Sequence, residues 1–131
     1  MKSVQDFLSE YFRLRTESHK VSCASFVPVI ERFFAQGYDP FNPKLSIARS
    51  AAEKVLAVSA SEGFTEVTTS GFTDGQWRAR YRLIASGDTW RISSVEWECG
   101  VCHGSGRSKN GSHECKLCKG KGWKLLGNLA V

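Results

Sequence analysis

The sequence predicts an α+β fold, in which three N-terminal helices pack on a curved antiparallel sheet, with a cysteine-rich hairpin near the C-terminus. Apolar residues recur at helical spacing in the first half, and alternate at strand spacing in the second. Two C-x-x-C pairs then stand close together near the end. We therefore expect residues 1–98 to form a helix-and-sheet domain, completed by a returning strand over 123–131, and residues 99–122 to form the hairpin.

The three predicted helices each have a stripe of apolar residues. The first follows Ser3 and Asp6, which resemble a capping box. The second covers about 22–36 and ends before Gly37, and a loop with two prolines follows over 38–43. The third covers about 45–61 and ends before Gly63. The stripes consist of Val4, Phe7, Leu8, Tyr11 and Phe12; of Phe26, Val29, Ile30, Phe33 and Phe34; and of Ile47, Ala48, Ala51, Ala52, Val55 and Leu56.

Three strands are predicted after the helices, over 64–70, 76–83 and 89–98. The middle strand alternates strictly, so that its two faces carry different residues. A tight turn at Gly87 and Asp88 joins it to the last strand. The alternation of that strand slips at Ser93 and Ser94, which predicts a bulge that bends the sheet. One face of the middle strand carries Trp77, Ala79, Tyr81 and Leu83, and the other carries Arg78, Arg80 and Arg82.

Four cysteines in two C-x-x-C pairs predict one tetrahedral metal site. The ligands would be Cys99, Cys102, Cys115 and Cys118, with twelve residues between the pairs. This spacing is typical of structural Zn²⁺, one per chain, although iron held by four thiolates uses the same ligands. Disulfides are disfavoured, because the cysteines are odd in number and no signal peptide is recognisable at the N-terminus.

Glycines follow each pair at the same offsets, so that both copies read C-x-x-C-x-G-x-G: CGVCHGSG over 99–106 and CKLCKGKG over 115–122. Glycine permits the positive φ that a tight turn behind a metal ligand requires. The pattern resembles the zinc repeat of DnaJ-type co-chaperones, whose cysteine-rich domain has four repeats and two zinc ions. Two repeats imply one zinc. The J-domain with its His-Pro-Asp triplet is absent, so the resemblance implies the hairpin and its ligands and not co-chaperone activity.

The order of helices and strands resembles a second family, the nuclear transport factor two-like (SnoaL-like) cone folds. Trp90-x-Ile92-x-x-Val95 in a late strand after a Gly-Asp turn matches a frequent pattern there. The resemblance implies a pocket between sheet and helices, with Trp77 and Tyr81 on its inward face. Members of this family include enzymes, binding modules and immunity proteins against bacterial toxins.

The positive charge of the chain is concentrated at its C-terminal end. Residues 1–98 are neutral, whereas residues 99–131 carry six basic side chains against one acidic, which is the whole formal excess of five. The candidate contact residues for an acidic protein are therefore Lys116, Lys119, Lys121 and Trp123 on the hairpin, with Arg78, Arg80 and Arg82 on the sheet. For these arginines, pairing with Glu66 or Glu96 is the competing interpretation.

We expect a non-catalytic zinc-binding protein-interaction module, of the immunity or adaptor type, in the cytoplasm. No acid–base pair is recognisable, and no apolar stretch is long enough to cross a membrane. A nucleic-acid-binding zinc protein is one alternative, because a basic finger with Trp123 could contact phosphates and stack on a base. A cone-fold enzyme or small-ligand binder is the other. The sequence leaves open whether the chain dimerises.

Overall fold

The structure is a computed structural model. It describes residues 1–19, 21, 24–35, 52–72, 76–99, 102–108, 111, 113–116 and 118–125. The predicted loop over 38–43, the start of the predicted third helix and the end of the predicted returning strand lie outside these residues.

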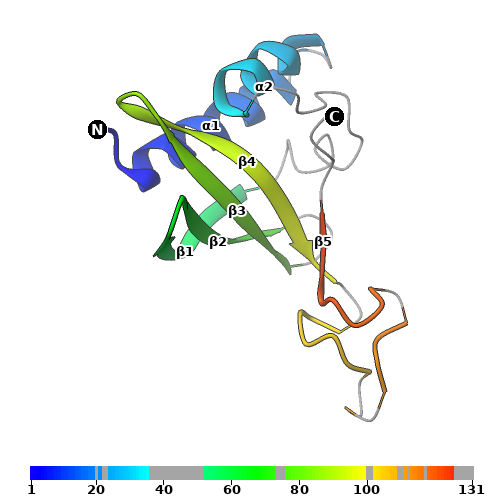
Figure 1. Ribbon diagram of the computed structural model, residues 1–131. Helices are drawn as coiled ribbons and strands as arrows, with labels where there is room; N and C mark the ends of the chain where they lie inside the picture. Colours follow the sequence, from blue (N-terminus) through cyan, green and yellow to red (C-terminus); the bar gives the residue numbers. More distant parts are fainter. Residues whose placement is uncertain are drawn as a thin grey trace.

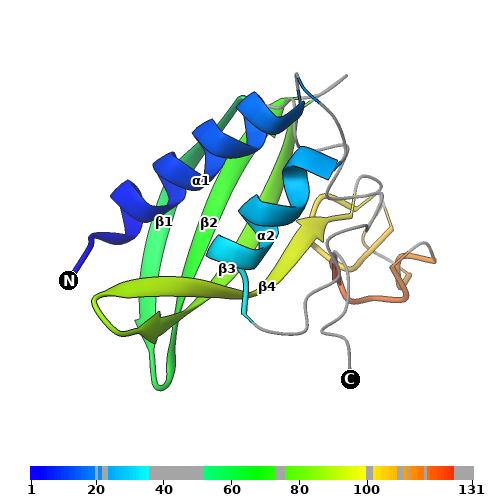
Figure 2. The same cartoon turned by 90° about the horizontal axis from the view of Figure 1, so that it is seen from above.

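Two helices cover one face of an antiparallel sheet, as Figure 2 shows from above. The helices are α1 (Val4–His19) and α2 (Val27–Phe33), and a 3-10 turn, Ala24–Phe26, leads into α2. The strands follow one another across the sheet in chain order: β1 (Ala52–Ser61), β2 (Phe64–Phe72), β3 (Gln76–Ser86), β4 (Thr89–Glu98) and the short β5 (Trp123–Leu125). The described part of the chain is therefore mostly β, with the helices as a second layer.

The prediction of three N-terminal helices on a curved sheet is wrong. The segment 52–61, assigned to the third helix, is strand β1, which pairs with β2 from Ala52 to Ser61 with one bulge at Leu56. Gly63 has φ +84° and lies in the turn of this hairpin, so it ends no helix. Helical spacing of alanines is a weak preference, and the backbone pairing offered by β2 outweighs it. The cone-like arrangement was inferred from three helices, and the third of these is a strand, so this prediction is not supported.

The predicted second helix over 22–36 is shorter than expected. Its α-helical part is α2, and Phe34 already has extended backbone angles and forms an isolated bridge with Ile92 of β4. The side chain of Arg91 donates hydrogen bonds to the carbonyl oxygens of Glu31 (2.8 Å) and Phe34 (3.1 Å). Because the last carbonyls of a helix lack internal partners, this arginine stabilises the end of α2.

The strand and bulge predictions are confirmed from β2 to β4. The register of β3 with β4 changes between Arg82 and Leu83, so that Ser93 is the extra residue on β4. Its hydroxyl donates to the Arg82 carbonyl oxygen at 3.1 Å. The first helix begins as predicted, because the N–H of Asp6 donates to Ser3 Oγ at 3.1 Å.

The apolar core lies between α1, α2 and the covered face of the sheet. Aromatic rings dominate it, and Tyr11 contacts Phe33 and Phe34 with ring centroids 5.4 and 5.5 Å apart. Within the described residues, the buried apolar set is Phe7, Leu8, Tyr11, Phe12, Phe26, Val29, Ile30, Phe33, Phe34, Val67, Ala79, Tyr81, Leu83, Ile92 and Val95.

A buried ion pair lies within this core. Arg15 Nη1 donates to Glu53 Oε1 at 2.8 Å, and both side chains are almost fully buried. Thr69 Oγ1 donates to the other carboxylate oxygen, and the guanidinium lies 4.9 Å from the Phe12 ring centroid. The pair joins α1 to β1. It was not predicted, because Glu53 was expected on a helix.

The segment with the four cysteines lies at the far end of β4 and β5, away from the helices (Figure 1). β5 is antiparallel to β4, with Glu98 opposite Trp123. The cysteine segment therefore leaves the sheet on one strand and returns to it on the next. No helix in the described residues is long and apolar enough to cross a membrane.

Candidate metal centre

Four buried sulfur atoms face one another in the segment beyond β4. The Sγ atoms of Cys99, Cys102, Cys115 and Cys118 all lie within 4.8 Å of one another. The Cys99–Cys115 pair is separated by 3.9 Å and the Cys102–Cys118 pair by 3.6 Å. A tetrahedron of sulfurs around Zn²⁺ at about 2.3 Å has edges of about 3.8 Å, so the cluster matches such a site in size.

The turn behind each pair of cysteines requires a left-handed backbone. Positive φ values occur at His103 (+53°) and Gly104 (+87°), and at the equivalent Lys119 (+55°) and Gly120 (+79°). Non-glycine residues adopt this conformation at a cost, so both turns store some strain. The two copies of the sequence repeat therefore have the same backbone conformation at these two positions.

The last glycine of each repeat lies against the backbone of the other repeat, where a side chain would not fit. Gly106 has φ +75° and Gly122 has φ +76°. A Cβ on Gly106 would overlap the carbonyl oxygen of Gly120, and a Cβ on Gly122 would overlap that of Gly104. The two turns thus pack against each other through their backbones, and only glycine leaves room for this approach.

Hydrogen bonds relate the two repeats by an approximate two-fold symmetry. The N–H of Cys99 donates to the Gly122 carbonyl oxygen, and the N–H of Cys115 donates to that of Gly106, both at 2.8 Å. An antiparallel pair closes each end of the unit: Glu98 with Trp123, and Arg107 with Glu114. Among its described residues, the four-cysteine unit (residues 99–122) is consequently held together by backbone hydrogen bonds and by its sulfur cluster.

Backbone N–H groups point at two of the sulfurs. Gly106 donates to Cys102 Sγ at 3.4 Å, and Gly122 donates to Cys118 Sγ at 3.1 Å. Burial disfavours the thiolate form at both positions. At Cys102 the Gly106 N–H and the neighbouring thiols outweigh burial and lower the pKa, whereas at Cys118 burial and the neighbouring thiols outweigh the Gly122 N–H and raise the pKa. A cation between these sulfurs would remove the cost of the second negative charge.

The cluster is suited to holding a metal ion rather than to acting on a substrate. All four sulfurs are buried, and four ligands complete a tetrahedron without an open position. The four cysteines are free, and the Cys99–Cys115 and Cys102–Cys118 sulfur separations far exceed a disulfide bond of about 2.05 Å. His103 and His113 are exposed, in agreement with their not being needed as ligands.

The predicted partner-binding lysines lie on the surface of the four-cysteine unit. Lys116, Lys119 and Lys121 are all exposed. Lys116 and Lys119 line a groove of about 500 Å³ together with His113, Glu114 and Cys115. Two cationic side chains therefore border a depression beside one of the sulfur ligands.

The predicted arginines lie on the face of the sheet opposite the helices, each close to a carboxylate. Arg78 pairs with Glu98, Arg80 with Glu96 at 3.3 Å, and Arg82 with Glu66 at 3.8 Å. The competing interpretation, which paired these arginines with Glu66 or Glu96, therefore holds for Arg80 and Arg82. These ion pairs neutralise the arginine charges with which an acidic partner would interact.

Trp123 connects the four-cysteine unit to the same face of the sheet. The Arg80 guanidinium lies 4.1 Å from the Trp123 ring centroid, and that of Arg78 lies 5.9 Å away. Arg78 also donates to the His103 carbonyl oxygen at 3.4 Å. The half-buried indole is thus part of the attachment between sheet and four-cysteine unit, which the sequence did not indicate.

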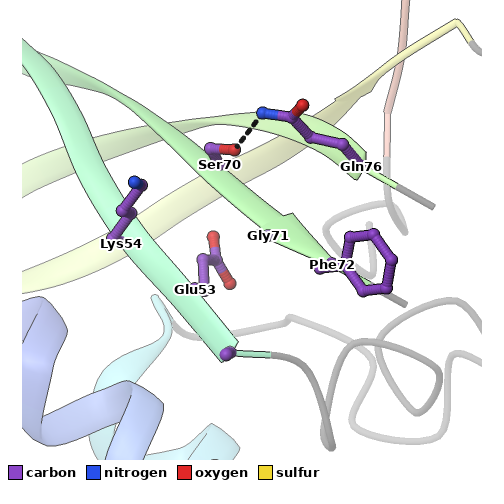
Figure 3. A pocket seen from close by; sticks show the side chains of 7 residues that line it. Glu53, Lys54, Ser70, Gly71, Phe72 and Gln76 are labelled. Carbon is purple, nitrogen blue, oxygen red and sulfur yellow. Dashed lines mark hydrogen bonds between the residues drawn. The ribbon is translucent and has the colours of Figure 1, made fainter. Parts of the chain in front are cut away.

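Trp77 and Tyr81 have different aromatic neighbours among the described residues. Tyr81 is buried against α1, whereas Trp77 stacks on Trp97 with ring centroids 4.9 Å apart and an interplanar angle of 13°. A cavity of about 480 Å³ lies where β1, β2 and β3 meet (Figure 3). Gln76 donates to Ser70 Oγ there at 3.1 Å, beside the exposed ring of Phe72. The lining residues are Ala52, Glu53, Lys54, Ser70, Gly71, Phe72 and Gln76.

No protein-family model, curated protein or solved structure matches this chain. The class of protein that the fold and site define is therefore a small, mostly β domain with a four-cysteine cluster that could hold a metal ion.

Proposed function

We propose that the chain is a non-catalytic zinc-binding protein, in which one Zn²⁺ holds the four-cysteine unit together and the unit presents a basic surface to a protein partner. The sulfur cluster carries this proposal, because its four buried ligands lie within 4.8 Å of one another. Zn²⁺ is favoured over iron because it binds four thiolates in closed structural sites and needs no redox partner.

The repeat supports a structural role for the metal. The C-x-x-C-x-G-x-G pattern resembles the DnaJ-type zinc repeat, and both copies have the same backbone conformation behind the second cysteine. The buried cluster found among the described residues of the unit consists of the four cysteines. Small segments whose buried groups are metal ligands commonly depend on the metal to stay folded.

The partner is proposed to be an acidic segment of another protein. Lys116 and Lys119 border a groove on the unit, and Lys121 is exposed on the same unit. An acidic side chain placed there would meet cations that have no ion pair within the described residues. Exposed charges of this kind mainly raise the rate of association and are screened by salt.

Binding of a fluorescent oligo-glutamate peptide to the zinc-loaded protein tests this proposal. We expect Lys119→Glu combined with Lys121→Glu to weaken binding about tenfold, mostly through the association rate, without loss of zinc. Arg13→Glu combined with Arg32→Glu is the matched control, because both arginines are exposed on the helices and the change in net charge is the same. Equal weakening by the control would show that only net charge matters, and would contradict a binding surface on the four-cysteine unit.

Nucleic acid is the competing partner, and the position of Trp123 argues against it. Base stacking needs a free aromatic face, whereas the Trp123 ring is approached by the guanidinium of Arg80 at 4.1 Å. Titration with single-stranded oligo-dT and oligo-U separates the two partners. Tight binding with a steep salt dependence, lost in Trp123→Ala, would favour nucleic acid and contradict the acidic-protein proposal.

A further inference from the structure

The outer edge of β1 is open in the described sheet. β1 pairs only with β2, and in the strand order it is the first strand of the sheet. An edge strand presents a row of backbone N–H and C=O groups without partners, and natural proteins commonly protect such an edge. The other edge of the described sheet is formed by β5 (Trp123–Leu125), which continues from the four-cysteine unit.

The second half of β1 has few of the features that usually prevent an edge strand from pairing with another chain. The stretch Val55–Ser61 has the sequence VLAVSAS, with neither a charge nor a proline. All residues from Leu56 to Ser61 are exposed, and Leu56 and Val58 keep 51% and 47% of their surface. A bulge at Leu56 is the one irregularity, and the strand pairs regularly with β2 on its far side. A neutral, β-prone edge of this kind favours the addition of another strand.

The charges at the two ends of this stretch indicate which strand is added. Lys54 precedes the neutral stretch and Glu62 follows it, and both are exposed. If two copies of β1 pair antiparallel, Lys54 of each copy lies near Glu62 of the other, twice by symmetry. Parallel pairing would instead bring like charges together. The edge is therefore complementary to itself in the antiparallel direction.

We propose that the chain forms a two-fold symmetric dimer through antiparallel pairing of β1 with β1 of a second copy. The pairing would join the two sheets into one and would shield Leu56 and Val58 of both copies. β1 and the four-cysteine unit lie at opposite sides of the sheet (Figure 1). Both four-cysteine units consequently stay free, so the dimer does not depend on the function proposed for them.

Sedimentation equilibrium of the full-length, zinc-loaded protein between about 1 and 500 µM tests the dimer. We expect a reversible monomer–dimer equilibrium within this range. Val58→Lys should weaken the dimer at least tenfold, because it places two like charges at the centre of the paired edges. Val21→Lys, the same change at another exposed valine, should leave the equilibrium unchanged.

A charge exchange tests the antiparallel direction without disturbing the fold, because both residues are exposed. Lys54→Glu and Glu62→Lys should each weaken the dimer a few-fold, and the double variant should restore it. A monomer at every concentration would overturn the proposal, even if a foreign extended peptide binds the edge. Equal effects of the two valine variants, or no restoration in the double variant, would overturn it as well.

Discussion

The helix-and-sheet part and the four-cysteine unit are held together by different means. The first buries a continuous set of aromatic and aliphatic side chains between α1, α2 and the sheet. The second buries a cluster of four cysteines among its described residues, and backbone hydrogen bonds join its two glycine-rich turns. Burial of apolar surface is spread over many residues, whereas a metal site depends on a few. The two parts should therefore respond to different perturbations.

Removal of one metal ligand should give the largest difference between the parts. The metal contributes on the order of 10–16 kcal/mol to the folding of small zinc units. Cys102→Ser should disorder residues 99–122 and release β5 from β4, while β1–β4 keep their core. Amide exchange measures this, with His113→Ala as the control at an exposed non-ligand. Global unfolding of Cys102→Ser would mean that the two parts are not separable.

The buried ion pair should give the next largest effect, confined to the helix-and-sheet part. Arg15→Met leaves the Glu53 carboxylate buried without its cationic partner, although Thr69 still donates a hydrogen bond to it. Breaking a buried pair from one side costs about 3–5 kcal/mol, and Arg15→Met with Glu53→Met should recover much of it. Urea unfolding measures the loss. Metal affinity should stay unchanged, and a parallel drop in affinity would show that the parts are coupled.

Alkaline pH should destabilise the helix-and-sheet part selectively. Burial raises the pKa of Tyr11 to about 12, and burial with the nearby Glu53 carboxylate raises the pKa of Tyr81 well above its usual value. In the folded state both phenols therefore stay protonated to a higher pH than in the unfolded state. This stabilisation is complete below pH 10 and is lost as the pH rises towards 12 and beyond.

The raised pKa of Tyr11 alone would contribute about 3 kcal/mol to this pH-dependent part of the free energy of unfolding. Urea unfolding at several pH values, compared with Tyr11→Phe, measures this contribution. A free energy of unfolding that falls equally in the variant would contradict the role of Tyr11.

A single added methyl group in the four-cysteine unit should give the smallest of these effects. Gly106→Ala forces a Cβ onto the Gly120 carbonyl oxygen of the other repeat at a positive φ, which should cost about 1–3 kcal/mol and lower metal affinity 10- to 100-fold. Gly87→Ala is the matched control, because φ there is +60° but no atom lies within 4 Å of the new Cβ. Chelator competition measures the affinity. Equal affinities of the two variants would contradict the interlocked turns.

Sequence predicted the two parts with unequal success. The clustering of the four cysteines and the positions of the turn glycines were predictable because the chemistry of this repeat permits few alternatives at that spacing. The strands from β2 to β4 and the bulge at Ser93 were predictable from alternation. β1 was missed because alanines and aliphatic residues at 47–56 fit a helix stripe, and only pairing with β2 decides between the two structures.

Two contacts between distant residues could not be predicted from local pattern. Arg15 lies four residues after Tyr11 and so on the apolar stripe of α1, which was a signal that it is buried. Its partner Glu53 became recognisable only once β1 was a strand. The placement of Trp123 beside Arg80 depends on β5 returning to β4 and not on any local motif.

The metal content of the purified protein tests most directly whether the four-cysteine unit is a metal site. Native mass spectrometry should find one Zn²⁺ per chain, and X-ray absorption should find four sulfur ligands at about 2.3 Å. A protein without metal, with disulfides among Cys99, Cys102, Cys115 and Cys118, or with nitrogen or oxygen in the coordination shell would contradict the site described for this unit.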